Sequence, residues 1–142
     1  MTYIEAEHVA ELIRRHGLVV APTQWSQDFG AHLKGLAWKG FSLDWTGVEH
    51  RLVDLEDPGS DPVPELMASR WPDVRRLFVL YSPSEPGLIA DAAFVANEFD
   101  RLYWKAPGSR YMCAVRSVAG EDEPDFTRLI EFNGANRLVF AG

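Results

Sequence analysis

Residues 76–81 read Arg-Leu-Phe-Val-Leu-Tyr, and this stretch, together with the segment up to residue 115, decides the fold. Its β-branched and aromatic residues predict a buried strand. Apolar residues then recur at steps of four and three along one face of a predicted helix: Leu88, Ala92, Val95, Phe99 and Leu102. Pro107 and Gly108 end that helix, and residues 111–115 predict a second strand. If the two strands pair directly, the unit is a right-handed parallel crossover.

Helix and strand patterns flank this unit on both sides. Upstream, the apolar spacing predicts helices over 3–16 and 25–36, a strand over 18–20, a hairpin over 41–53 and a short helix over 61–71. Downstream, an Asn-Gly pair between the apolar runs 126–132 and 137–141 predicts a C-terminal β-hairpin. The sequence therefore predicts an α+β fold, a mixed β-sheet with about four helices packed on it. We expect one globular domain over residues 1–142.

The chain is acidic, with a formal net charge of −7 at pH 7. Two short segments, 54–65 and 121–125, contribute almost all of the excess. Both segments are rich in turn-forming residues, so we expect them on loops. Acidic loops produce a negative potential that steers a basic partner. They argue against a nucleic-acid partner, because phosphate binding relies on clustered Lys and Arg.

Composition and targeting signals favour an ordinary globular protein. Hydrophobic residues make up 46% of the chain and charged residues 25%. The first seven residues carry neither the basic nor the apolar region of a signal peptide, so we expect a cytoplasmic protein with no membrane partner. The single cysteine, Cys113, lies in an apolar stretch and is expected to be a buried structural thiol, with a reactive thiol as the alternative.

The sequence contains none of the common catalytic or phosphate-binding motifs. It lacks the Gly-Lys-Ser/Thr of a phosphate-binding loop and the G-x-S-x-G of a nucleophile elbow. Four scattered histidines offer no tetrahedral metal site: His8, His16, His32 and His50. We therefore expect no metal and no other cofactor. A nucleophilic Cys–His pair using Cys113 stays open, since such partners are distant in sequence.

Acidic and aromatic side chains are the remaining candidates for a binding surface. Three tryptophans sit near the ends of predicted elements and beside Lys or Arg, where aromatic anchors of protein interfaces occur. The candidate partner-binding residues are Asp54, Glu56, Asp57, Asp61, Glu121, Asp122, Glu123, Asp125, Trp38, Trp71 and Trp104. The alternative is that the acids only solvate the protein and the tryptophans border the core.

These features lead to three functional hypotheses from different classes. The first is a non-catalytic, acidic protein-binding module: an inhibitor such as an immunity or antitoxin protein that masks a basic toxin or nuclease. The second is a small enzyme or ligand-binding domain with an aromatic-lined pocket, formed by residues such as Trp25, Trp38 and Trp45. The third is a homo-oligomer subunit with apolar surface on a two-fold patch.

Overall fold

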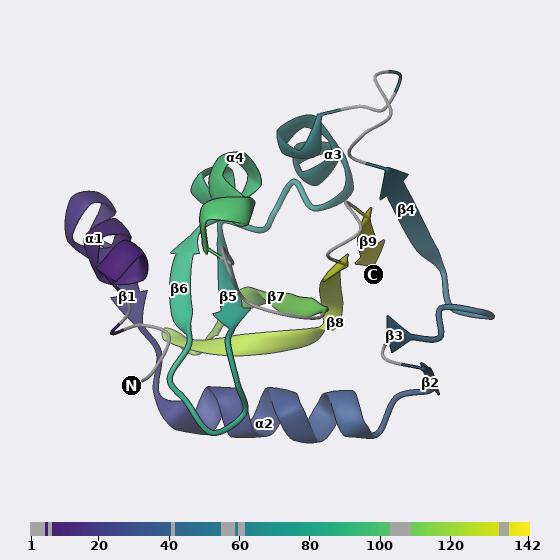
Figure 1. Cartoon of the computed structure of the whole chain (residues 1–142), viewed down its shortest axis with the longest axis horizontal. Coiled ribbons are helices and arrows are strands. Elements are labelled where there is room, and N and C mark those ends of the chain that lie inside the picture. The colour runs from purple at the N-terminus through teal and green to yellow at the C-terminus, as the bar shows by residue number, and fades with distance from the viewer. Residues whose placement is uncertain are drawn as a thin grey trace.

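A seven-stranded antiparallel sheet organises the chain in the computed structural model (Figure 1). The structure describes residues 5, 7–40, 42–54, 59, 62–102, 109–133 and 137–142. From one edge to the other, the strands are β1 (Val19–Val20), β6 (Leu88–Asp91), β5 (Arg76–Leu80), β7 (Arg110–Val118), β8 (Glu121–Asn133), β9 (Arg137–Ala141) and β4 (His50–Asp54). Every neighbouring pair is antiparallel.

Helices cover both faces of this sheet (Figure 1). On one face lie α1 (Glu7–His16), α3 (Val63–Arg70) and α4 (Ala92–Leu102), and on the other lie α2 (Thr23–Lys34) and a small hairpin of β2 (Trp38–Lys39) and β3 (Ser42–Leu43). The α+β class, the helices on the sheet and the C-terminal hairpin β8–β9 are thereby confirmed. The single domain over the whole chain stays a prediction.

The predicted parallel crossover is wrong. β5 and β7 do pair directly, but they pair antiparallel, with Phe78 opposite Cys113. The cause is an extra strand, because the beginning of the predicted helix is β6, which pairs with both β5 and β1. Three consecutive apolar side chains from Leu88 to Ala90 are all buried, as suits a strand covered on both faces. The helix begins only at Ala92.

The predicted hairpin over 41–53 is also wrong in its pairing. β3 turns back on β2, with Gly40 at a positive φ of 66° in the connection. β4 instead pairs along its whole length with β9, from His50 opposite Ala141 to Asp54 opposite Arg137. β4 therefore belongs to the large sheet, where it pairs with β9 over five residues, and does not form a local hairpin with the residues just before it.

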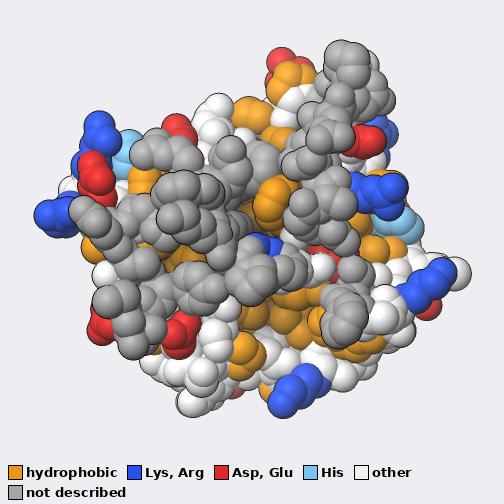
Figure 2. Space-filling view, viewed as in Figure 1, with side chains coloured by type: hydrophobic (Ala, Val, Ile, Leu, Met, Phe, Trp, Pro, Cys, Tyr) orange, Lys and Arg blue, Asp and Glu red, His pale blue; other side chains and the backbone are white. Residues whose placement is uncertain are grey.

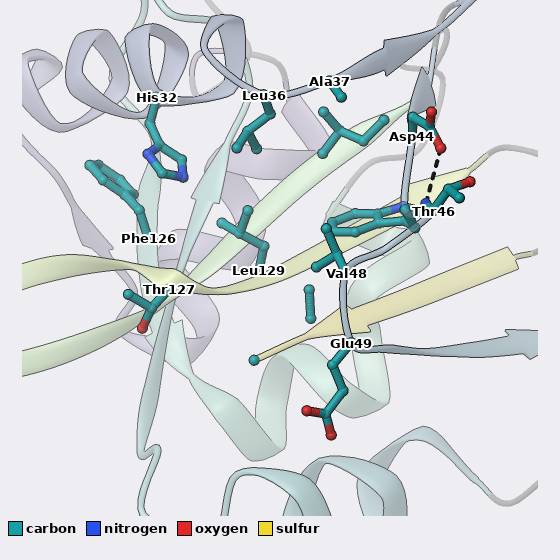
Figure 3. Close-up of a pocket in the computed structure, with 14 residues that line it drawn as sticks. His32, Leu36, Ala37, Asp44, Thr46, Val48, Glu49, Phe126, Thr127 and Leu129 are labelled. Carbon is teal, nitrogen blue, oxygen red and sulfur yellow. Dashed lines mark hydrogen bonds between the residues drawn. The ribbon is translucent and has the colours of Figure 1, made fainter.

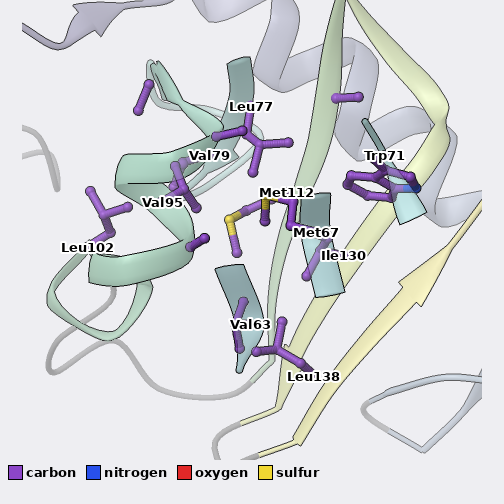
Figure 4. Close-up of a cluster of buried hydrophobic side chains, with 14 of the residues drawn as sticks. Val63, Met67, Trp71, Leu77, Val79, Val95, Leu102, Met112, Ile130 and Leu138 are labelled. Carbon is purple, nitrogen blue, oxygen red and sulfur yellow. The ribbon is translucent and has the colours of Figure 1, made fainter. Parts of the chain in front are cut away.

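Two hydrophobic clusters, one on each face, hold the layers together. Between the sheet and α1, α3 and α4 lie Leu77, Val79, Met112, Ile130 and Leu138, together with Val95 of α4 (Figure 4). Leu88, Ala92 and Val95 are buried as the helical stripe predicted, whereas the side chain of Phe99 lies outside the described part of the chain.

Within the described residues, no helix is long and apolar enough to cross a membrane.

The second cluster lies between the sheet and α2. Phe29 of α2 packs near Phe78, and Cys113 of the same cluster is fully buried. Burial, with a smaller contribution from the negative charge of Asp125, raises the pKa of the Cys113 thiol far above its ordinary value. The thiol is therefore protonated at neutral pH, which agrees with a structural cysteine. Gly30 lets α2 approach the segment after β5 closely, because a Cβ there would lie 2.7 Å from Cβ of Pro83.

Candidate functional site

The predicted acidic loop at 121–125 is part of a strand. Glu121–Asn133 forms β8, and the turn before it is only Ala119 and Gly120, both at positive φ. Asp122 forms an ion pair with Arg76 at 2.6 Å, and Glu123 forms one with Arg116 at 2.6 Å. The loop assignment was wrong because the turn-forming residues of this segment continue the long β7–β8 ladder. Two of its charges are therefore partly neutralised by neighbours.

Asp125 is the most buried of the predicted acidic residues that the structure describes. It is 9% exposed, and its carboxylate accepts a hydrogen bond from the Thr127 amide at 3.0 Å and another from the Thr127 hydroxyl. Directly after it, residues 126–128 bulge out of the ladder, since Asp125 pairs with Ala114 and the next paired residue is Leu129. Asp125 therefore stabilises a β-bulge, and little of its side chain is exposed to a protein partner.

The predicted acidic residues that the structure describes do not converge on one face. Asp54 is exposed at the end of β4, beside Arg137, which pairs with Asn133 at the end of β8. Glu121 begins β8, so the length of that strand separates it from Asp54. On the face shown in Figure 2, described Asp and Glu side chains are dispersed and do not gather in one patch. Glu56, Asp57 and Asp61 lie outside the described residues.

The predicted interface tryptophans have different positions. Trp71 is 1% exposed and belongs to the core, where its Nε1 donates to the Gly142 carbonyl at 2.7 Å, so its assignment to an interface was wrong. Trp38 is 42% exposed, and its Nε1 donates to the Leu33 carbonyl at 2.9 Å. Trp104 lies outside the described residues. Trp38 is thus the one member of this group with described, exposed aromatic surface.

A pocket of about 390 Å³ lies between the end of α2, the segment 43–49 and the β8 bulge (Figure 3). We call it the Trp45 pocket. Its apolar lining comes from Leu36, Ala37, Leu43, Trp45, Val48, Phe126, Leu129 and Ala141, and its polar lining includes His32, Asp44, Thr46, Glu49 and Thr127. Of the three tryptophans expected in an aromatic pocket, only Trp45 lines this one. Trp25 packs edge-on against Phe78, and Trp38 lies outside the lining.

The β8 bulge supplies one wall of the pocket. It directs Phe126 toward α2, where the ring stacks on Phe29 at 5.2 Å and on His32 at 5.1 Å between centroids. In Figure 3, His32 and Phe126 lie together on one side and Val48 lies on the other, with Leu129 between them. Phe126 and Trp45 thus line the same apolar space.

A buried carboxylate holds the opposite wall. Glu131 of β8 is 3% exposed, and its two oxygens accept hydrogen bonds from the Leu43 amide at 3.0 Å and from Trp45 Nε1 at 3.2 Å. A carboxylate is buried at this depth only when hydrogen bonds compensate it. These two bonds also fix the Trp45 indole and the backbone at Leu43. The pKa of the nearby Tyr111 hydroxyl is raised mainly by burial, and the negative charge of Glu131 raises it further.

Acidic groups lie at the rim of the pocket. Asp44 accepts a hydrogen bond from the Thr46 amide at 3.0 Å, and hydrogen bonds from Thr46 hold the pKa of its carboxyl below the ordinary value. Asp44 is therefore ionised at neutral pH, and Glu49 belongs to the same lining. Within the described residues, no group of three or more His, Cys, Asp or Glu side chains is arranged to hold a metal ion.

Sequence reasoning missed three residues that shape this pocket: His32, Phe126 and Glu131. A signal existed for Glu131, because it is the one charge in the run Leu129-Ile130-Glu131-Phe132, where a polar residue must face either solvent or a buried partner. Phe126 gave no signal, since its direction depends on the bulge.

Comparison with protein-family models, with curated proteins and with solved structures gives no match for this chain.

Proposed function

We propose that the chain is a ligand-binding domain, and that the Trp45 pocket holds a small molecule with a flat apolar body and a cationic or hydrogen-bond-donating group. The observation that supports this most is that two aromatic side chains, Trp45 and Phe126, line one pocket of about 390 Å³. Small-molecule pockets are typically apolar, largely preformed and roughly 300–1,000 Å³ in volume.

Preorganisation supports the same proposal. The Trp45 ring is held by the Glu131 carboxylate before any ligand arrives, so a ligand does not have to order it. Aromatic rings prefer offset-stacked or edge-to-face arrangements, which favours a planar ligand between Trp45 and Phe126.

Charge supports the cationic part of the ligand. Asp44 is ionised at the rim, Glu49 lies in the same lining, and the whole chain carries a net charge of −7. A negative rim over apolar walls attracts a cation and repels an anion of the same shape. An amine bound over the Trp45 face also gains a cation–π interaction.

A matched pair of probes tests this proposal. We expect 1-naphthylmethylamine to shift the indole N–H signal of Trp45 in an NMR titration and 1-naphthoate to bind at least about tenfold more weakly, a difference of about 1.4 kcal/mol. Trp45→Ala should weaken amine binding by about tenfold or more. Trp38→Ala serves as the control, because Trp38 is exposed in the neighbouring segment but does not line the pocket.

The result can contradict the proposal in two ways. If neither probe shifts the Trp45 signal at millimolar concentration, the pocket does not bind planar apolar ligands. If both probes bind equally well, the acidic rim does not select charge, and the ligand class must be neutral.

We also propose, as a second candidate function, inhibition of a basic protein partner such as a toxin or nuclease in the cytoplasm. The net charge of −7 favours it, as do the exposed side chains of Asp54 and Glu121. Rim charges of this kind act mainly on the association rate.

A kinetic test separates this candidate from the ligand-binding proposal. Replacing Glu121, Asp122 and Glu123 together with Ser should slow association with a captured basic partner and flatten its dependence on salt between about 50 and 500 mM. Asp125 is left unchanged because it is buried. Association at the wild-type rate at low salt would leave the acidic residues with a solvation role alone.

A further inference from the structure

Another pocket, about 430 Å³ in volume, lies where β5 begins beside the last part of β7. We call it the arginine pocket. Its lining includes four of the eleven arginines of the chain: Arg75, Arg76, Arg116 and Arg128. The two pockets share none of their described lining residues, so the arginine pocket is a separate place on the molecule.

The sheet topology brings these arginines together. β5 and β7 are paired from Leu80 opposite Tyr111 to Leu77 opposite Ala114, and β7 then continues to Val118 in its pairing with β8. Continued by two positions, the register of β5 and β7 brings Arg75 beside Arg116. Arg128 reaches the same pocket from the β8 bulge. Residues far apart in the sequence thus place several guanidinium groups around one space.

Most of these positive charges have acidic neighbours. Three arginines form ion pairs: Arg76 with Asp122 at 2.6 Å, Arg116 with Glu123 at 2.6 Å, and Arg128 with Asp73 at 2.8 Å. Each of these six side chains keeps at least 31% of its surface exposed. Exposed ion pairs contribute little to stability, so a bound anion can replace a carboxylate in them at small cost.

Arg75 differs from the other three arginines. Its side chain is exposed, and in the described part of the chain no Asp or Glu lies within ion-pair distance of it. Asp125 also lines the pocket, but it is 9% exposed and its Oδ1 accepts two hydrogen bonds from Thr127. Like charges opposite each other across strands are unfavourable, which applies to Arg75 and Arg116. An anion between these two guanidinium groups removes that repulsion.

We propose that the arginine pocket binds a small molecule through a phosphoryl group, held between Arg75 and Arg116. A guanidinium group presents a planar fork of N–H donors that matches phosphate oxygens. A phosphoryl group carries a charge of about −1.5 to −2 at pH 7 and three acceptor oxygens, so it can bind two arginines at once. A single carboxylate offers these arginines no more than Glu123 already does. Ser117 lines the same pocket and adds a hydroxyl donor.

This proposal does not depend on the Trp45 pocket, and its probe is chosen accordingly. Glycerol 2-phosphate carries a phosphoryl group and no aromatic ring. We expect it to bind with a dissociation constant of about 1 mM at low salt, because the net charge of −7 opposes any anion. Isothermal titration calorimetry of the full chain measures the affinity. Succinate, a dianion whose charge is divided between two carboxylates, should bind at least about tenfold more weakly.

Removal of a positive charge tests the site directly. Arg75→Gln and Arg116→Gln should each weaken binding of glycerol 2-phosphate by about tenfold or more. Arg15→Gln is the matched control, because it removes the same charge from an exposed ion pair on α1, outside the pocket. The control should bind as the wild type does. Far-UV circular dichroism and thermal unfolding confirm that each variant is folded.

Removal of the competing carboxylate should have the opposite effect. Glu123→Gln releases Arg116 from its ion pair and should tighten binding of glycerol 2-phosphate by about threefold or more. Glu11→Gln changes the net charge equally and releases Arg15, which is not in the pocket lining, so it should leave the affinity unchanged.

Four results would each overturn the proposal. They are a wild-type chain that binds no glycerol 2-phosphate up to about 10 mM, an Arg75→Gln variant that binds normally, succinate that binds as tightly, and a Glu11→Gln variant that gains as much affinity as Glu123→Gln. The last result would mean that net charge alone governs binding.

Discussion

Replacing Trp71 with alanine is expected to destabilise the protein by about 3–5 kcal/mol, the range for removing a large aromatic side chain from a core. Trp71 is 1% exposed and lies edge-on to Phe140 at 5.6 Å between ring centroids. The substitution also removes the hydrogen bond from its Nε1 to the carbonyl of Gly142. A loss of this size approaches the whole stability of a marginal domain, for which the free energy of unfolding is about 5–15 kcal/mol.

Urea titration of matched variants measures this effect. Trp71→Phe keeps most of the packing and should lose less than half as much free energy of unfolding, so a measurable protein remains if the alanine variant does not fold. Trp38→Ala removes the same side chain from a position that is 42% exposed, and it should cost under about 2 kcal/mol. Equal losses at Trp71 and Trp38 would mean that Trp71 is not part of the core.

Trp71 also illustrates why sequence position alone does not identify an interface. It follows α3 and precedes Pro72, which is where a surface anchor is expected at an element end. Its indole nevertheless turns inward, because Gly142 supplies a carbonyl acceptor 71 positions away. A contact of that sequence separation leaves no local pattern. Charge and flanking residues alone therefore do not separate a core tryptophan from an exposed one.

Local patterns predicted the elements better than their pairing. The helical spacing of Ala92 and Val95 and the strand at 76–81 correspond to α4 and β5. The parallel crossover failed because Leu88 is compatible with both a helical stripe and a strand that is buried on both faces. The predicted pairing of β4 failed similarly, since its true partner, β9, lies more than 80 residues later in the chain. Which strands pair depends on contacts between residues that are distant in the sequence, so local patterns do not predict it.

The pocket was predictable in kind but not in position. An aromatic lining was expected, and Trp45 belongs to it. Phe126 reaches the pocket because of a three-residue bulge, and no turn-forming residue in the sequence indicates that bulge. The acidic segment after Gly120 was misread for a related reason, because its consecutive polar residues all pair with β7 in a ladder and do not form a loop. Sequence reasoning treats polarity as exposure, whereas Asp125 and Glu131 are polar and buried.

Glu131→Leu is the second substitution with a large expected effect, about 2–4 kcal/mol of lost stability. The Leu43 amide and Trp45 Nε1 lose their acceptor, and a buried donor left without a partner costs about 1–3 kcal/mol. Part of this cost is offset, because leucine avoids the burial of a charge. Glu131→Gln keeps one acceptor oxygen and replaces the other with an NH2 group that cannot accept, so one of the two donors is left unpaired and the loss should be about 1–3 kcal/mol.

The binding measurement makes the Glu131 result specific to the pocket wall. If Glu131 positions Trp45, Glu131→Leu should weaken binding of 1-naphthylmethylamine by about tenfold or more under conditions where the variant is fully folded. Glu131→Gln keeps one of the two acceptors and should bind more tightly than Glu131→Leu. Glu123→Gln is the control for removal of a strand carboxylate, because Glu123 pairs with Arg116 on the surface. A stable Glu131→Leu variant with unchanged binding would show that the indole holds its position by packing alone, and that the buried carboxylate does not organise the site.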